Sequence, residues 1–169
     1  NLYTGMLTDT GSFQFPATTG KVHRIVAHLV DLGVQPNVVF EHIYNSFSED
    51  RLRLFGYCIT EKMDSYPEVN AAVISLNRDE LKRFNVGTGD TEGLVNFPLK
   101  VSNIHFSALV IDRTELIKMS FRSKGEVDCN LFARKYFNGG GHKNAAGGAS
   151  HDTLENTLRK LEKALQEYL

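Results

Sequence analysis

The chain has 169 residues, of which 41% are hydrophobic and 23% are charged, and its formal net charge is −1. This length and composition fit a globular protein with one large domain or two small ones. The near-zero charge excludes a global basic field that would attract long nucleic acid, so any anionic ligand must be bound by a local cluster.

The cysteines and the hydropathy pattern indicate a cytoplasmic protein with no membrane partner. Cys58 and Cys129 are far apart and form no CxxC pair, which argues against a disulfide framework or a zinc knuckle. No apolar run approaches the roughly 20 residues that cross a bilayer, and the N-terminus lacks a signal-peptide pattern. The chain starts at Asn1 rather than Met, in what reads as the middle of a strand, so we expect further sequence upstream.

The first sixty residues are expected to form one strand and three helices. The strand covers residues 2–8 and ends in the turn-forming Asp9-Thr10-Gly11-Ser12, where polar side chains can be displayed. Apolar residues at helical spacing and a stop at Gly33 predict helices over residues 19–33, 37–47 and 48–59. Residues 61–68 are polar and without periodicity, as in a linker.

The pattern restarts after this linker and predicts a separate α/β unit. Residues 69–76 are apolar and β-branched, as in a buried strand, and Asn77 with Glu80 forms a capping-box start for a short helix. Residues 104–112 and 116–123 alternate apolar and polar positions around a short connection, which predicts an antiparallel hairpin. Further helices are expected over residues 88–99, 128–137 and 152–169.

A glycine-rich segment, Gly139-Gly140-Gly141-His142-Lys143-Asn144-Ala145-Ala146-Gly147-Gly148, precedes the last helix. Small residues let the backbone approach a ligand, and successive N–H groups in such a loop form an anion-binding nest. His142 and Lys143 add positive donors. The alternative is a glycine-rich turn whose polar side chains face water. The His-Lys-Asn triplet among small residues favours phosphate binding.

A second polar cluster ends the strand over residues 116–123. It contains Arg122, which can hold a phosphate in bidentate fashion, and the hydroxyl of Ser123. A hydrated strand end is the alternative. Because one predicted helix separates this cluster from the glycine-rich segment, the two can converge on one anion.

Asp9 is a candidate ligand for a hard divalent cation because it follows a predicted strand. Its alternative role is that of a capping or Asx-turn residue. One carboxylate does not hold a metal, and no second ligand lies close in sequence. His23 and His28 are five residues apart and therefore do not share one helical face.

Three motifs in order resemble the DHH phosphoesterase family, and within it the bacterial nanoRNases. They are Asp9-Thr10-Gly11-Ser12-Phe13, Phe121-Arg122-Ser123 and the glycine-rich segment up to Gly147. The GGGH-x-x-AAG pattern is specific to the DHH-associated C-terminal domain of that family, whereas the first motif alone is weak. The resemblance covers essentially the whole chain.

The resemblance implies an α/β fold with two parts and a cleft between them. Residues 1–60 would be the end of an N-terminal DHH-type parallel-sheet domain, residues 61–68 a linker, and residues 69–169 a substrate-binding domain with a mixed sheet. It also implies a pair of manganese ions (Mn2+) in the N-terminal domain, which would activate a water for attack on phosphorus.

The resemblance also implies roles for individual residues. Asp9 would be the last metal-ligating, catalytic aspartate. The substrate grip would consist of Arg122, Ser123, Gly140, Gly141, His142, Lys143 and Asn144. The Asp-His-His triplet that names the family is absent from these residues. We therefore expect this chain to supply one metal ligand and the substrate-binding half, and to be inactive alone.

The implied activity is hydrolysis of short oligoribonucleotides (nanoRNA), of adenosine 3′,5′-bisphosphate, or of both. Two alternatives stay open: a non-catalytic nucleic-acid-binding or dimerisation module, and a cyclic-dinucleotide or polyphosphate phosphohydrolase. A homodimer is also left open by the sequence.

Overall fold

The computed structural model describes residues 1–15 and 17–169, and the chain divides into two compact units, Asn1–Phe47 and Ser48–Leu169. Among the described residues, no helix combines the length and the apolar character that crossing a membrane requires.

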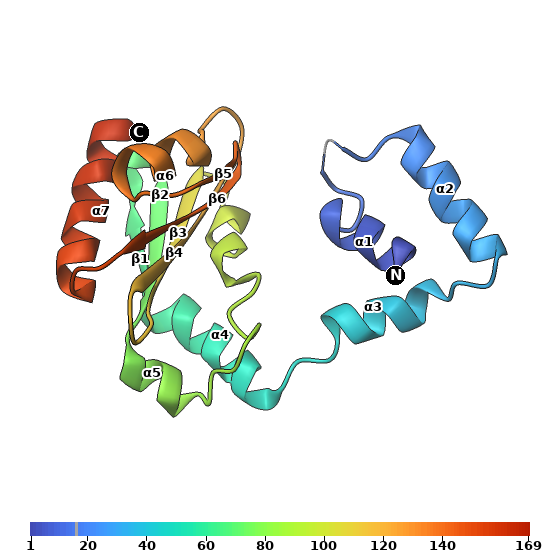
Figure 1. Cartoon of the computed structure of the whole chain (residues 1–169), viewed down its shortest axis with the longest axis horizontal. Coiled ribbons are helices and arrows are strands. Elements are labelled where there is room, and N and C mark those ends of the chain that lie inside the picture. Colours follow the sequence, from blue (N-terminus) through green and yellow to red (C-terminus); the bar gives the residue numbers. More distant parts are fainter. Residues whose placement is uncertain (16) are drawn as a thin grey trace. The chain divides into compact units, whose positions relative to one another are not determined.

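The first unit is built from helices (Figure 1): α1 (Leu2–Asp9), α2 (Gly20–Asp31) and α3 (Pro36–Tyr44). The strand expected over residues 2–8 is wrong, because this segment is α1. Tyr3 and Leu7 are its buried residues, and their spacing of four places them on one helical face. The described part of this unit contains no strand, so it does not display the parallel sheet that the resemblance implies.

Local capping explains where α2 begins and ends. The Oγ1 of Thr19 accepts a hydrogen bond from the backbone N–H of Val22 at 3.4 Å, and Gly33 has a φ of +97° that suits glycine. The helix predicted to stop at Gly33 is therefore confirmed. No residue of α2 is buried, and a groove of about 540 Å³ runs along residues of α1, α3 and the end of α2.

The second unit contains a six-stranded mixed sheet in the order β1-β2-β3-β4-β6-β5. Its strands are β1 (Met63–Tyr66), β2 (Ala71–Leu76), β3 (Phe106–Asp112), β4 (Ile117–Ser123), β5 (Gly140–His142) and β6 (Ala145–Ser150). Its helices are α4 (Glu49–Glu61), α5 (Arg78–Arg83), α6 (Cys129–Tyr136) and α7 (Leu154–Tyr168), with 3₁₀ turns η1 (Pro67–Val69), η2 (Leu94–Asn96) and η3 (Pro98–Lys100). All strand pairs are antiparallel except β2 with β3.

Three expectations for this unit differ from the structure. Residues 63–66 of the expected linker form the edge strand β1, so the polar stretch is part of the sheet. The helix expected over residues 88–99 is replaced by turns with η2 and η3, because Gly89 and Gly93 take positive φ and Pro98 interrupts the segment. The glycine-rich segment is a β-hairpin, β5 with β6, rather than an open loop.

Other expectations are confirmed. The antiparallel hairpin is β3 with β4, and α6 and α7 lie where apolar periodicity placed them. The capping box of α5 is complete: the backbone N–H of Glu80 donates to Asn77 Oδ1 at 2.9 Å, and that of Asn77 donates to Glu80 Oε2 at 2.7 Å. Cys58 and Cys129 are free, buried thiols, and burial raises the pKa of Cys58 to about 12.

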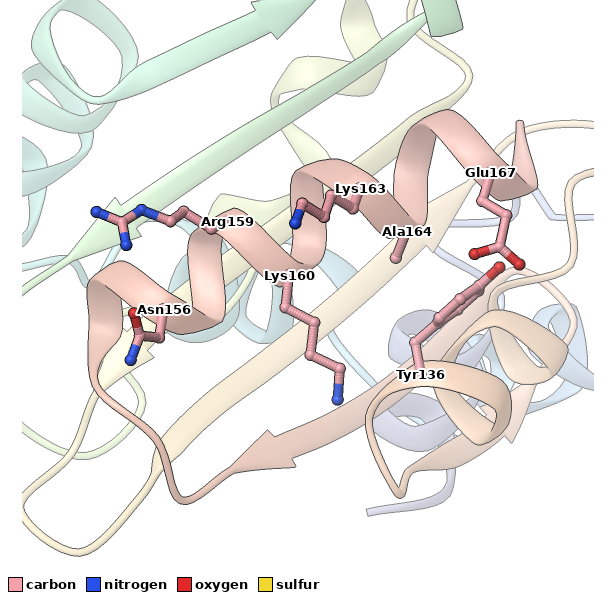
Figure 2. Close-up of a pocket in the computed structure, with 7 residues that line it drawn as sticks. All are labelled: Tyr136, Asn156, Arg159, Lys160, Lys163, Ala164 and Glu167. Atoms are coloured by element: carbon pink, nitrogen blue, oxygen red, sulfur yellow. The ribbon is translucent and has the colours of Figure 1, made fainter.

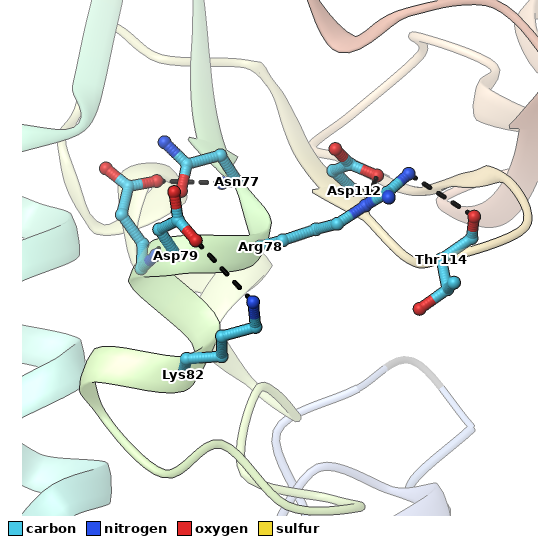
Figure 3. A network of polar contacts seen from close by, with 7 residues as sticks. Asn77, Arg78, Asp79, Lys82, Asp112 and Thr114 are labelled. Carbon is cyan, nitrogen blue, oxygen red and sulfur yellow. Dashed lines mark hydrogen bonds and ion pairs between the residues drawn. The ribbon is translucent and has the colours of Figure 1, made fainter.

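A polar contact ties α5 to the turn between β3 and β4 (Figure 3). The Nε of Arg78 donates to Asp112 Oδ1 at 3.0 Å, and an Nη donates to the carbonyl of Thr114 at 3.3 Å. The crossover from β2 to β3 is thus fixed at one end of the sheet.

The two faces of the sheet carry separate hydrophobic cores. One core lies under α6 and α7 and includes Phe106 and Phe121, both fully buried. The other lies under α4 and η2 and includes Leu109 and Ile111. Because alternate residues of a strand point to opposite faces, β3 contributes to both cores. This alternation also decides on which face each candidate site residue lies.

Candidate anion-binding site

One register row across the sheet brings two of the predicted site residues to the same face. Ala72 pairs with Ser107, Ser107 with Arg122, Arg122 with Ala145, and Ala145 with His142. Residues paired directly across strands point to the same face of a sheet. Arg122 and His142 therefore share the face opposite α6 and α7, separated by the single residue Ala145.

The surface around these two side chains is made of small residues. Gly140 pairs with Gly147, and Gly147 pairs with Ser120, in the neighbouring row on the same face. None of the three is fully buried. We name this area the open strip; it comprises Ser120, Arg122, Gly140, His142, Ala145 and Gly147. Little side-chain bulk stands between its two basic groups and an approaching ligand.

Arg122 is a half-buried cation without a carboxylate partner. One Nη donates to the neighbouring carbonyl of Phe121 at 2.9 Å, and no Asp or Glu of the described chain lies within ion-pair distance. Burial lowers the pKa of its guanidinium, while nearby Cys129 opposes that shift. A guanidinium stays charged in proteins, so the lost hydration makes an anionic partner favourable here.

His142 lies at the other end of the open strip. Its side chain is exposed and has no hydrogen-bond partner within the described part of the chain. It can therefore turn either ring nitrogen toward a ligand held by Arg122.

Ser123 and Asn144 have different surroundings. Ser123 pairs with Phe106 and so points to the face of α6 and α7, where it is buried. Its Oγ donates to the carbonyl of Val127 at 2.6 Å, and the Nδ2 of Asn144 donates to Ser123 Oγ at 2.9 Å and to the Gly125 carbonyl at 3.2 Å. The structure does not bring these two side chains to the open strip, and they hold the loop between β4 and α6.

The glycine-rich hairpin offers fewer free N–H groups than a nest would. Strand pairing uses part of its backbone, and the N–H of Gly141 donates to Asn130 Oδ1 at 3.0 Å. The predicted nest is therefore wrong as a geometry, because long-range pairing with β4 draws this segment into the sheet. The hairpin instead presents the exposed side chain of His142 next to a surface of small residues.

Close packing explains two of its glycines. A Cβ at Gly148 would lie 2.8 Å from Phe137 Cβ, and a Cβ at Gly139 would collide with the Gly147 carbonyl oxygen. The hairpin thus needs glycine at these positions in order to pack on itself and on the end of α6.

Lys143 occupies the turn between β5 and β6 and is exposed. Its Nζ donates to Glu126 Oε2 at 2.6 Å, and its carbonyl accepts a bond from the N–H of Cys129 at 2.6 Å. Glu126 was not anticipated from the sequence, because only the folded loop brings it next to Lys143.

Ser107 was also missed. It is fully buried in the same row as Arg122, and its Oγ has no hydrogen-bond partner in the described chain. The turn η2 contacts both β3 and β4 on this face. Only the crossover topology could have revealed that a polar side chain sits beside Arg122.

Asp9 does not follow a strand, because it is the last residue of α1; its side chain is exposed. No group of three or more His, Cys, Asp or Glu side chains that could hold a metal ion occurs in the described residues. The donors present therefore do not fit the two-metal centre that the resemblance implies.

A groove of about 340 Å³ lies along α7, beside Tyr136 at the end of α6 (Figure 2). Its charged side chains are largely engaged elsewhere: Arg159 pairs with Glu155, and Glu167 accepts from Lys135 at 2.8 Å. Lys160 lies over the Phe137 ring, 5.1 Å from its centroid. This groove is formed by the helices on the face opposite the open strip.

The mixed sheet, its edge hairpin of glycines and the half-buried arginine beside that hairpin define a class of α/β domain. The DHHA1 domain family matches residues 68–169, and the chain belongs to this family. The resemblance to DHH phosphoesterases with their associated C-terminal domain is thereby confirmed.

Curated proteins of the same family are similar to this chain in sequence. The chain is 31% identical over 169 residues to the bifunctional oligoribonuclease and PAP phosphatase NrnA of Bacillus subtilis, covering 99% of this chain and 52% of that protein. The corresponding protein of Thermus thermophilus is 28% identical and is covered to 49%. The chain thus spans about half the length of these curated relatives.

A solved structure of an exopolyphosphatase-related protein from Bacteroides fragilis is similar over 99% of this chain and 49% of that one, with a TM-score of 0.94 and 41% identity. The pGpG-specific phosphodiesterase PggH of Vibrio cholerae shares the fold, with a TM-score of 0.54 at 14% identity. The relatives therefore agree with membership of the DHH family.

Proposed function

We propose that this chain supplies the substrate-binding part of a phosphoesterase that cleaves oligoribonucleotides of a few nucleotides, adenosine 3′,5′-bisphosphate, or both. The relatives whose names carry these activities are the Bacillus and Thermus proteins. Within this proposal the open strip holds a phosphate group of the substrate.

The observation that carries the proposal is the half-buried guanidinium of Arg122, which no carboxylate of the described chain neutralises. Arginine presents a planar fork of donors that matches two phosphate oxygens. His142 lies in the same register row and can donate to a third oxygen or to the next phosphate. The small residues between them leave room for the phosphate itself.

The other predicted residues take supporting roles in this proposal. Gly140 is part of the low surface, and the Gly141 N–H helps to fix β5 through Asn130. Ser123 and Asn144 keep the hairpin turn and the loop after β4 in place. Lys143 adds an ammonium group in the turn between β5 and β6, where it is ion-paired with Glu126.

Asp9 is the one residue of this chain that we assign to a metal, by resemblance to the family. Since the described residues do not complete a metal site, we expect the 169-residue chain alone to bind phosphate but not to hydrolyse a phosphodiester. Manganese-dependent turnover by this chain would contradict that expectation.

The test is calorimetric titration of adenosine 3′,5′-bisphosphate into the wild type, Arg122→Ala and His142→Ala. We expect Arg122→Ala to weaken binding by about tenfold or more, since bonds to charged groups contribute about 1.5–3 kcal/mol. We expect a smaller loss for His142→Ala, because His142 is exposed.

Lys118→Ala is the matched control. Lys118 lies on the same strand and face as Arg122, four residues away, and is exposed. At about 3.3 Å per residue it is some 13 Å from the row of Arg122. If Lys118→Ala weakens binding as much as Arg122→Ala, the effect is one of net charge and the assigned site is wrong.

A further inference from the structure

The hairpin turn at Lys143 and the loop between β4 and α6 form one interlocked block. Asn144 bonds to Ser123 Oγ and to the carbonyl of Gly125, while the N–H of Ser123 donates to the carbonyl of Asn144 at 3.2 Å. The Lys143 carbonyl accepts from the N–H of Cys129. Several bonds therefore fix the backbones of the turn and the loop relative to each other.

Within this block the ammonium group of Lys143 already forms an ion pair with a carboxylate. Glu126 lies in the loop, one residue after Gly125, and its Oε2 is 2.6 Å from Lys143 Nζ. The hydrogen bond to Lys143 and its charge lower the pKa of Glu126, so the carboxylate is ionised near neutral pH. The two side chains are exposed, and water reaches the pair from several sides.

Lys143 and Arg122 are both cations, but they differ in whether a carboxylate pairs with them. Arg122 has no carboxylate partner among the described residues, whereas Lys143 is neutralised by Glu126. Lys143 directly follows His142, the last residue of β5, and lies in the turn between β5 and β6. A phosphate that reaches beyond Arg122 and His142 meets an ammonium that already has an anion.

We propose that Glu126 is an internal competitor that the substrate's phosphate must displace from Lys143, and that it thereby limits how tightly the open strip holds anions. This inference rests on the proposed function. Glu126 then affects only those ligands whose phosphate reaches Lys143.

The competition has a bounded size. Exposed ion pairs are weak and screened by salt, so removing the competitor changes affinity by about two- to fivefold rather than by orders of magnitude. The gain should shrink at high ionic strength for the same reason. The small gain in affinity and its decrease with salt distinguish a competing carboxylate from one that stabilises the fold.

The experiment measures inorganic phosphate and adenosine 3′,5′-bisphosphate binding to the full chain by calorimetry at low and high salt. The variants are Glu126→Gln, Lys143→Met and the double variant Glu126→Gln with Lys143→Met. We expect Glu126→Gln to bind about two- to fivefold more tightly than wild type at low salt. The double variant should lose that gain.

Glu155→Gln is the charge-matched control, since Glu155 forms an exposed ion pair with Arg159 on α7. It removes the same charge and should leave binding unchanged. Thermal unfolding of each variant verifies that the fold is retained.

Two negative results have different meanings. If wild type binds either ligand and Arg122→Ala weakens that binding, but Glu126→Gln binds equally or less tightly, then the competition is wrong and the proposed function stands. If wild type binds neither ligand, or Arg122→Ala has no effect, both proposals fail together.

Discussion

The two faces of β4 have different roles, and neighbouring residues of this strand therefore serve different purposes. Phe121 points under α6 and α7, where it is fully buried and its ring lies 5.2 Å from that of Phe132. The next residue, Arg122, points to the opposite face and is only half-buried. One face of β4 therefore serves stability, while the other presents charge.

The same division runs through the edge hairpin. Ala146 and Gly148 pair with Phe121 and Met119 and lie against the aromatic core, whereas Ala145 and Gly147 pair with Arg122 and Ser120 on the open strip. A period of two thus predicts which substitutions harm folding and which harm binding.

Phe121→Ala and Arg122→Ala form the sharpest contrast. Truncating a fully buried phenylalanine costs about 3–5 kcal/mol of unfolding free energy through lost transfer energy and a cavity. Arg122→Ala should change the unfolding free energy by less than about 1 kcal/mol, because no ion pair is lost. Urea denaturation of both variants measures the difference. Equal destabilisation would refute the division between the faces.

Gly148→Ala and Gly147→Ala test the same contrast with a single methyl group. A Cβ at Gly148 would come within 2.8 Å of Phe137 Cβ and 3.2 Å of Phe121 Cε2. Overpacking of that kind costs about 1–3 kcal/mol. A Cβ at Gly147 meets nothing nearer than the Met119 carbonyl at 3.4 Å. We expect thermal unfolding to show a clear loss for the first variant and a small one for the second.

The third contrast concerns Glu80, whose buried carboxylate joins α4 to α5 beside the core under α4. It accepts hydrogen bonds from Tyr57 Oη at 2.6 Å, Lys62 Nζ at 2.9 Å and Asn77 N at 2.7 Å. Burial alone would raise the pKa of Glu80, but these bonds lower it overall. Glu80→Gln should therefore cost about 1–3 kcal/mol at neutral pH.

The pH dependence of that cost has a defined sign. Since the folded-state pKa lies below the unfolded one, the contribution of ionised Glu80 is present above the unfolded pKa and is lost as pH falls through the folded pKa. The stability difference between wild type and Glu80→Gln should shrink in acid. A difference that stays constant down to the acid transition would contradict the ionised network.

Local signals predicted much of this fold, and long-range pairing accounts for the failures. The capping box at Asn77 and the amphipathic helix α7 depend on neighbours in sequence. The hairpin of β5 and β6 does not, because glycine and alanine have low strand propensity and the strands exist through pairing with β4. The strand prediction for residues 2–8 was wrong because a short apolar run fits a strand or a helix equally well.

The candidate site was predictable to a similar degree. Arg122 and His142 were expected to converge, and the register places them in one row. The neighbours Ser123 and Asn144 were expected to bind substrate too, but a shift of one residue along a strand reverses the face. Without the register, the sequence could not tell which of Arg122 and Ser123 points toward the open strip.

The smallest effect is expected at the exposed ion pairs on the helical face, which sharpen the contrast with Glu80. Lys135 donates to Glu167 at 2.8 Å, and their hydrogen bond raises the pKa of Lys135 and lowers that of Glu167. Both side chains are more than half exposed, so water and salt screen the pair. Lys135→Gln should leave the unfolding midpoint unchanged within error. A loss comparable to that of Glu80→Gln would mean that a short distance alone, without burial, makes an ion pair important for this fold.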